Sequence, residues 1–413
     1  MSVRTIETFE AGAGAGADGR FDRQARIEGW DQGRLAGAPV LVVGAGAIGN
    51  EALKLLALVG VGRVTVVDSD RIETSNLSRT VLFRDGDVGA WKAEVAARRA
   101  AEIAPGLRVE AIVGDVEHDL GLGRVRAADA VLGCVDNLHA RVAMNRACLR
   151  AGKPWVNAAI GPRAAEVAVF AGDGEGPCYE CGLGEAAWRR FRRRFSCADG
   201  LRRAAREGRV ATVATLASIA AALQVEALLV LLHGAGRGSP LCGVGPGERA
   251  FLSIAPPLGL RKLALARDPA CTAHERWDGE ARAIAASARE ATADDLMAAV
   301  GGDRVELDWD LVTGLRCEAC GEAEERLGPK GRLLAVEAAC PRCRAGRRAE
   351  TVSGVRRGEA LARVPLARLG VPERAVLRVG AGARIELVEL TGSGTGSGSG
   401  SGTGSGGSGG AGG

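Results

Sequence analysis

Short apolar runs alternate with amphipathic stretches over the first 160 residues. The runs at 40–43, 64–67, 108–113, 130–135 and 155–158 have the length of buried strands. Helical patterns lie between them, including 91–103, 138–151 and the segment opened by Gly49, and a helical lead-in is expected over 20–35. Strands that alternate with helices favour an α/β fold with a doubly wound parallel sheet.

The pattern changes after about residue 280. A helix is expected over 283–300, with Thr292 placed to cap its second half, and short alternating strands such as 375–379 and 384–388 follow. Residues 281–390 are therefore expected to form a small β-rich accessory domain. Residues 1–19, and the Gly/Ser/Thr tail at 391–413, bury too little apolar surface to fold and are expected to be disordered.

One apolar stretch, 210–232, is long enough to cross a bilayer. It carries polar residues such as Gln224 and Glu226, so a buried helix behind the sheet is the preferred interpretation and no membrane association is expected. The first twenty residues have no apolar h-region, which favours a cytoplasmic protein.

Composition narrows the class of protein further. The net charge is only +4, which argues neither for nor against nucleic acid. The cysteines number eleven, an odd count that disfavours an all-disulfide framework. Most of them lie in C-x-x-C or C-x-x-H pairs, a spacing typical of metal sites.

A glycine loop follows the first strand, with Gly44, Gly46 and Gly49 at its corners. Such a loop lets the backbone approach a phosphate at a helix N-terminus, where free N–H groups favour an anion. Asp68 ends the next strand and is placed to accept hydrogen bonds from ribose hydroxyls. These features fit a Rossmann-like nucleotide site, but they suit a nicotinamide enzyme equally well.

Additional polar residues distinguish the site from a dinucleotide pocket. Arg79 and Lys92, together with Asn76, provide more positive charge and hydrogen bonding than a pyrophosphate diester requires. They suit the charge that develops when pyrophosphate leaves. Asp136 is the kind of carboxylate that holds Mg²⁺ together with substrate phosphates. Because the strand ends of a parallel sheet share one edge, these residues are expected to converge.

In order and spacing, these motifs resemble the ThiF/MoeB/HesA family, whose adenylation domain is shared with ubiquitin-activating enzymes. The resemblance covers about residues 20–275, and the adenylation domain is expected over 20–280. The matching segments are Arg20–Gln24, Gly44–Gly49, Asp68–Asp70, Ser75–Arg79, Gly89–Lys92 and Cys134–Asn137.

The resemblance implies adenylation, by ATP with Mg²⁺, of the C-terminal glycine of a ubiquitin-like or sulfur-carrier protein ending in Gly-Gly. It assigns Asp68 to ribose and Asp136 to magnesium. It assigns the nucleotide phosphates to Asn76, Arg79, Lys92 and, from the other subunit of a homodimer, Arg23. Asp70 belongs to the same nucleotide-binding set. A conjugating enzyme or a sulfur donor is a further implied partner.

Two zinc sites are predicted. The first comprises Cys178, Cys181, Cys271 and His274, with Cys242 as an alternative to His274. The second comprises Cys317, Cys320, Cys340 and Cys343, whose spacing is that of a zinc ribbon at about 310–350. The ribbon either staples its domain or binds a partner.

Cys197 is the candidate acceptor thiol, because the resemblance places a thioester-forming or persulfide-forming cysteine in this segment. The preceding arginine run, Arg189–Arg194, would favour the thiolate. That run favours an acidic protein partner over nucleic acid. Adenylation of a tRNA base or a peptide, an NAD-dependent oxidoreductase and a non-catalytic zinc scaffold remain the alternatives.

Overall fold

Five parallel strands form the centre of the larger domain, as the alternation of strands and helices predicts. They are β2 (Pro39–Val43), β3 (Arg63–Asp68), β4 (Arg108–Val113), β5 (Ala130–Gly133) and β6 (Trp155–Ile160), and they lie side by side in the order β4-β3-β2-β5-β6. The computed structural model describes residues 6–10, 19–193, 212–234, 243–333, 337 and 339–392. The chain reverses its direction of strand addition between β2 and β5, which is where open α/β sheets bind ligands.

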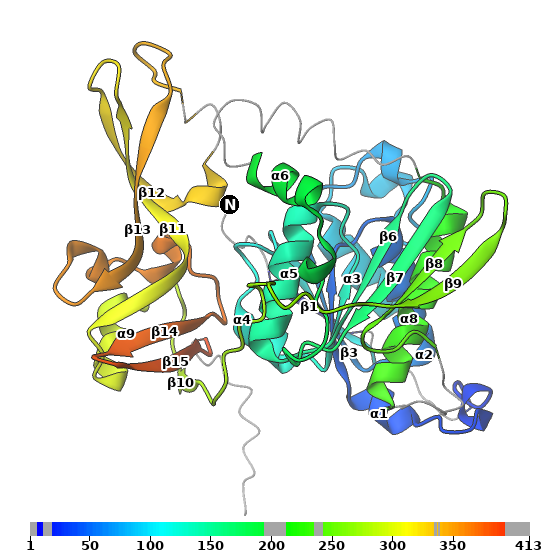
Figure 1. Cartoon of the computed structure of the whole chain (residues 1–413). Coiled ribbons are helices and arrows are strands. Elements are labelled where there is room, and N and C mark those ends of the chain that lie inside the picture. Colours follow the sequence, from blue (N-terminus) through cyan, green and yellow to red (C-terminus); the bar gives the residue numbers. More distant parts are fainter. Residues whose placement is uncertain are drawn as a thin grey trace, which may run out of the picture.

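The sheet continues beyond the parallel core as antiparallel strands. β7 (Ala164–Phe170), β8 (Glu248–Ser253) and β9 (Gly259–Ala264) extend it from β6, to the right in Figure 1. At the opposite edge β1 (Ile6–Glu10) pairs antiparallel with β4. The expectation that residues 1–19 are entirely disordered is therefore wrong for 6–10, because main-chain pairing with the edge of β4 supplies what the local sequence does not.

Helices cover both faces of the sheet. Side chains from α2 (Ala47–Val59), α3 (Lys92–Ile103) and α8 (Ala214–Leu232) share one buried cluster with Val40 and Val42 of β2. Side chains from α4 (Leu122–Ala127) and α5 (Leu138–Ala151) share another with Leu41 and Val43. Because successive side chains of a strand point to opposite faces, the two clusters form the two layers of a doubly wound fold.

Helix α8 is the apolar stretch that is long enough to cross a membrane. It packs against α2 and the strands β5, β6 and β7, as the interpretation of a buried helix predicts. Gln224 at its middle is fully buried and donates to the carbonyls of Gly133 at 3.0 Å and Val156 at 2.8 Å. The buried amide nitrogen thus has two acceptors, one in each of the neighbouring strands β5 and β6.

The helical lead-in expected over 20–35 is wrong in extent. It contains a 3-10 turn, η1 (Gln24–Arg26), and the short helix α1 (Gln32–Gly37), which lie at the lower right in Figure 1. Gly29, with a φ of 79°, separates them, and Asp31 caps α1 by accepting the backbone N–H of Arg34. A left-handed residue between the two elements and a new N-cap before the second prevent one continuous helix over 20–35.

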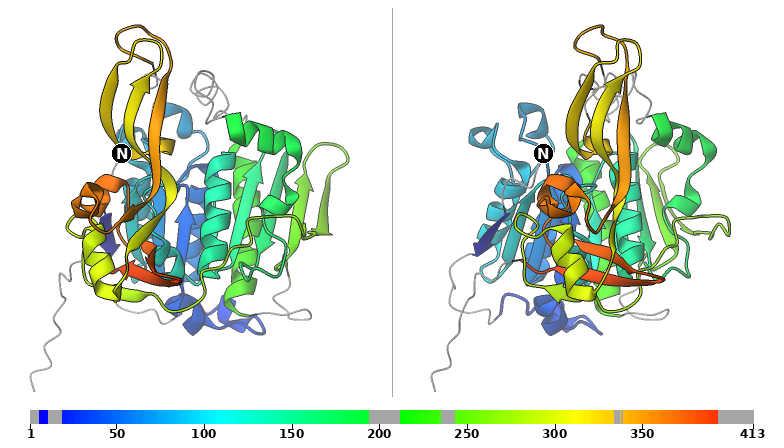
Figure 2. Two further views of the ribbon diagram at one scale, coloured as in Figure 1. Left: turned by 60° about the vertical axis from the view of Figure 1, so that its left-hand side comes forward. Right: turned by 90° about the vertical axis from the view of Figure 1, so that its left-hand side faces the viewer.

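The accessory domain lies beside α4 and α5 (Figures 1 and 2). Its strands are β10 (Arg282–Ile284), β11 (Arg304–Cys317), β12 (Ala323–Pro329), β13 (Arg347–Arg356), β14 (Val376–Ala381) and β15 (Arg384–Leu390), and they form one sheet. The helix expected over 283–300 is confirmed only as α9 (Ala293–Val300), which Thr292 caps by accepting the N–H of Asp295. The start of the expected helix lies instead in β10, which pairs with β15, because strand pairing overrides local helix propensity there.

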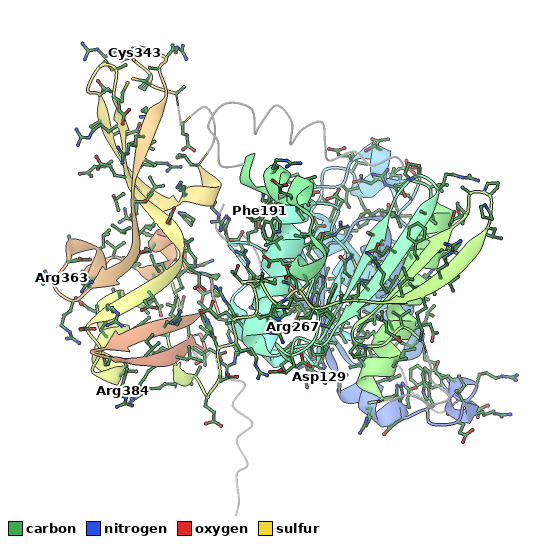
Figure 3. The ribbon with its side chains drawn as sticks, in the orientation of Figure 1. Asp129, Phe191, Arg267, Cys343, Arg363 and Arg384 are labelled. Atoms are coloured by element: carbon green, nitrogen blue, oxygen red, sulfur yellow. The ribbon has the colours of Figure 1, made fainter. Side chains whose placement is uncertain are left out.

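The distal parts of β11, β12 and β13 form an arm that projects away from the accessory core, and Figure 3 shows Cys343 at its tip. At the base of the accessory domain, polar contacts join it to the larger domain. Arg150 of α5 pairs with Asp308 at 2.9 Å, and the N–H of Gly123 in α4 donates to the Arg374 carbonyl at 2.8 Å. The accessory sheet is therefore fixed against the face of the larger domain that carries α4 and α5.

Candidate nucleotide site

The three glycines of the loop after β2 meet different steric demands. Gly44 has a φ of 97°, and a Cβ there would lie 2.6 Å from the Cys134 carbonyl oxygen. A Cβ at Gly49 would lie 1.9 Å from the Gly44 carbonyl oxygen, so the first turn of α2 packs directly on the loop. Gly46 faces open space. The loop is therefore closed on the protein side and accessible on the ligand side, as a phosphate cradle requires.

Asp68 ties β3 to this loop. Its Oδ2 accepts the N–H of Ala45 at 2.7 Å and its Oδ1 accepts the N–H of Asp70 at 2.8 Å. Burial raises the pKa of Asp68 to about 6, although attraction to Lys92 opposes the shift. The carboxylate thus lies at the end of β3 in an orientation that two backbone bonds fix.

Lys92 begins α3 and pairs with Asp70 at 2.8 Å. Burial alone would lower the pKa of Lys92, but the carboxylates of Asp68 and Asp70 outweigh burial and raise that pKa. The ammonium therefore stays charged near neutral pH, and its remaining hydrogens are donors for an anion.

Asn76 and Arg79 come from a single turn after β3. Asn76 ends η2 (Thr74–Asn76), is buried, and accepts the N–H of Glu73 at 3.0 Å. Arg79 donates to the Ser75 carbonyl at 2.6 Å, which directs the guanidinium along the turn. The turn itself is held in the larger domain because Asn50 of α2 accepts the N–H of Leu82 at 3.0 Å.

Asp136 follows β5 and is exposed to solvent. The next residue, Asn137, caps α5 by accepting the N–H of Ala140 at 2.8 Å. Most of these groups border one cavity of about 960 Å³ at the carboxyl ends of the strands, whereas the predicted residue Gly49 packs against the loop and does not line it. The predicted residues that line it are Gly44, Gly46, Asp68, Asp70, Asn76, Arg79, Lys92 and Asp136. The sequence-based convergence is thus observed, whereas the role of each residue stays a prediction.

The cavity also contains polar residues that the sequence analysis did not select. They are Arg71, Asp115, Arg141 and Thr212, among others. Arg71 stacks over the ring of Trp91 at 3.8 Å, and Arg141 donates to the Val135 carbonyl at 2.7 Å. Arg141 lies one turn after the Asn137 cap, so the helix start next to Asp136 was the signal that could have identified it.

Arg23 does not line the cavity of its own chain. The neighbouring Gln24 donates to the Val59 carbonyl at the C-terminal end of α2, whereas the glycine loop lies at the N-terminal end. A helix of thirteen residues separates the two ends by about 20 Å. Within one subunit Arg23 is thus remote from the cavity, and its assignment to a second subunit stays a prediction.

The first predicted metal site is assembled in the structure. The ligand atoms of Cys178, Cys181, Cys271 and His274 all lie within 4.8 Å of one another. The Sγ atoms of Cys178 and Cys271 are 3.8 Å apart, the separation of about 3.8 Å that tetrahedral zinc with bonds of about 2.3 Å imposes. The ring Nδ1 of His274 lies 3.1 Å from the Gly174 carbonyl, which orients Nε2 toward the thiols. The donor set fits zinc.

The second site lies at the tip of the arm. Cys317, Cys320, Cys340 and Cys343 also bring their sulfurs within 4.8 Å of one another. Around them, cations and carboxylates pair across the strands, as with Arg348 and Glu318 at 3.7 Å. A tip whose charges are paired in this way favours the zinc staple over a nucleic-acid surface, which needs an excess of positive charge.

The remaining cysteines divide into two groups. Cys197 and the alternative ligand Cys242 lie outside the described residues. Cys134 and Cys148 are buried in the larger domain, and burial raises the pKa of Cys134 to about 12 and that of Cys148 still further. Burial thus disfavours the reactive thiolate form of both cysteines.

The fold is of the doubly wound α/β class, and its cavity lies at the strand ends where such folds bind nucleotides. Residues 21–250 match the model of the ThiF family, and the chain therefore belongs to this family. The sulfur carrier protein adenylyltransferase of Thermus thermophilus is 38% identical over 244 residues, which are 58% of this chain and 83% of that protein.

Two further relatives are similar in the same region. The molybdopterin-synthase adenylyltransferase of Salmonella typhimurium is 30% identical over 259 residues, 61% of this chain and 94% of that protein. The SAMP-activating enzyme E1 of Haloferax volcanii is 40% identical over 155 residues, 38% of this chain and 57% of that protein. With these relatives, the chain is an enzyme of the adenylyltransferase class.

Proposed function

We propose that the enzyme uses ATP and Mg²⁺ to adenylate the C-terminal glycine of a ubiquitin-like or sulfur-carrier protein. One observation supports this most strongly. Arg79 and Lys92 border the same cavity as the glycine loop, and the carboxylate of Asp136 lies at the same sheet edge. The relatives named as adenylyltransferases of a sulfur carrier and of molybdopterin synthase support the substrate class.

The proposed reaction is an in-line displacement at the α-phosphorus. A carboxylate oxygen of the carrier forms a bond to phosphorus, the bond to the bridging oxygen breaks, and pyrophosphate leaves with that electron pair. The carboxylate is already ionised at pH 7, so no general base is needed. Catalysis then depends on positioning two anions and stabilising the charge of the leaving group.

Each residue has a defined task in this proposal. The loop around Gly46 holds phosphate through backbone N–H groups, and Asp68 accepts the ribose hydroxyls. Arg79 and Lys92 donate to the phosphate oxygens, where Lys92 exchanges part of its pairing with Asp70. Asp136 holds magnesium, which neutralises charge on the triphosphate when it is bound.

We further propose a second step at Cys197. The thiolate attacks the acyl carbon of the adenylate, a thioester forms, and AMP leaves. A conjugating enzyme would then take over the acyl group and free the thiolate, or sulfide from a sulfur donor would displace the Cys197 thiolate from the acyl carbon and leave a thiocarboxylate on the carrier. A homodimer would bring Arg23 of one subunit to the phosphates of the other. The sulfur-carrier and SAMP-activating relatives support the class of reaction that follows.

ATP–pyrophosphate exchange tests the first step. Exchange that depends on a carrier ending in Gly-Gly is expected, and Asp136→Ala and Arg79→Ala are expected to reduce it by about 100-fold or more. Asp129→Ala is the matched control, because Asp129, which Figure 3 labels, is an exposed aspartate just before β5, whereas Asp136 follows the other end of that strand. Exchange retained in both active-site variants would refute the site assignment.

The competing functions have their own readouts in the same assay. Exchange driven by tRNA or by a short peptide, without a carrier protein, would replace the proposed substrate. Binding of a nicotinamide dinucleotide without any binding of ATP would establish an oxidoreductase instead.

A further inference from the structure

A buried carboxylate joins the accessory domain to a loop of the larger domain. Asp119 is 4% exposed, and its Oδ1 accepts from the Arg332 guanidinium at 2.5 Å. Its Oδ2 accepts the backbone N–H of Asp115 at 2.9 Å. One side chain therefore connects two segments that are 213 residues apart in sequence.

The loop that Asp119 holds is a wall of the nucleotide cavity. Gly114, Asp115 and Val116 line this cavity directly after β4. The N–H of Gly114 donates to the Asp68 carbonyl at 3.3 Å, so the wall adjoins the residue proposed to bind ribose. A Cβ at Gly114 would lie 2.6 Å from the Cβ of Asp119. The position of the Asp119 side chain thus sets the position of the wall.

Arg332 reaches Asp119 from the segment between the two cysteine pairs of the ribbon. It ends η5 (Lys330–Arg332), which follows β12 immediately. Gly331 lies against the ring of His118, where a Cβ would be 2.7 Å from Nε2. The neighbouring Lys330 instead pairs with Asp310 of the accessory domain at 3.0 Å. Within the same turn, one cation serves the nucleotide wall and the other serves the accessory domain alone.

We infer that Arg332 is a positioning residue for the nucleotide site, acting through Asp119 on the wall formed by Gly114–Val116. Removing the guanidinium leaves a buried carboxylate unpaired, which is costly, and the loop relieves this cost by moving Asp119 toward water. That movement shifts the cavity wall and weakens nucleotide binding without altering Arg79, Lys92 or Asp136. The inference rests on the proposed function only in taking ATP as the nucleotide.

The test measures the Kd of ATP with Mg²⁺ by titration calorimetry, and the KM and kcat of pyrophosphate exchange, in the full-length protein. Arg332→Ala is expected to raise the Kd and the KM for ATP by about 3- to 30-fold and to leave kcat nearly unchanged. Arg332→Lys is expected to restore part of the affinity, and Lys330→Ala is the matched control with wild-type values. Adding Asp119→Asn to Arg332→Ala is expected to cause no further loss, since both act through the same contact.

A folded Arg332→Ala protein with an unchanged Kd would overturn the inference. If Arg332→Ala fails to fold, Asp119→Asn decides, because it keeps an acceptor for the Asp115 N–H but removes the charge that pairs with Arg332. A raised Kd for ATP in this variant is expected, and an unchanged Kd would overturn the inference. A raised Kd in a protein that shows no exchange with any carrier would support the inference and refute the proposed function. The positioning role of Arg332 and the proposed function can therefore be refuted independently of each other.

Discussion

The Asp68 carboxylate accepts the backbone N–H of Ala45, so the end of β3 is bonded to the glycine loop after β2. Because burial raises the pKa of Asp68 to about 6, this bond and the proposed ribose contact depend on pH. The carboxyl group of Asp68 carries a proton below about pH 6 and is ionised above it, whereas an unfolded aspartate is ionised above about pH 4.

Nucleotide affinity is therefore expected to fall as the pH drops through 6. Protonation removes a lone pair from oxygens that already accept two backbone N–H groups. A loss of about tenfold in ATP affinity at pH 5 relative to pH 7.5 is expected, measured by calorimetry. Asp68→Asn should bind weakly at both pH values and so separates this effect from the titration of ATP itself. An equal pH dependence in wild type and variant would contradict the assignment.

Two glycine substitutions should affect different properties, the first the stability of the fold and the second the binding of ATP. Gly49→Ala forces a Cβ to within 1.9 Å of a backbone oxygen, so it is expected to destabilise the fold by about 3 kcal/mol or more. Gly46→Ala meets no protein atom within 4 Å and should leave the melting temperature nearly unchanged while weakening ATP binding at least tenfold. Thermal melting with calorimetry checks both, and normal ATP binding by Gly46→Ala would argue against phosphate at this loop.

Metal content follows from the two ligand clusters. Elemental analysis is expected to find about two zinc ions per chain. Cys178→Ser and Cys320→Ser should each lower this to about one, and Cys148→Ser, in a buried cysteine outside both clusters, should not. Both cluster variants are also expected to melt at lower temperature, since bound zinc contributes folding free energy. A folded protein without metal would refute both sites.

The thiol prediction separates the two proposed steps. Cys197→Ala is expected to retain carrier-dependent pyrophosphate exchange and to lose any DTT-sensitive adduct with the carrier, detected by mass spectrometry. Cys148→Ser serves as the control, since Cys148 is a buried core thiol that does not line the cavity. An adduct that survives Cys197→Ala would place the acceptor thiol elsewhere.

Much of the larger domain could be predicted because its signals are local. The helix at 138–151 has its cap at Asn137, and the strand at 108–113 has apolar residues at four of its six positions, so both were found with their observed bounds. The shared strand edge then placed Asp68 and Asp136 in one site. Each of these inferences needs only periodicity, a cap or the rule for parallel sheets.

The errors occur where distant segments determine the structure. Residues 6–10 become a strand only because β4 leaves an edge, and 282–284 become one only because β15 lies beside them. The contact between Arg332 and Asp119 spans two domains, and no periodicity in the sequence indicates it. Such pairings depend on the assembled tertiary structure.

The amide of Gln224 fixes the register of α8 on the sheet. Sliding or rotating the helix by one position would strip hydrogen bonds from this amide and from the carbonyls of Gly133 and Val156. At the other side of the undescribed stretch 194–211, Phe191 stacks on His139 of α5 at 4.7 Å. The described residues on both sides of this stretch are therefore held against β5, β6 and α5, beside the strand end that precedes Asp136.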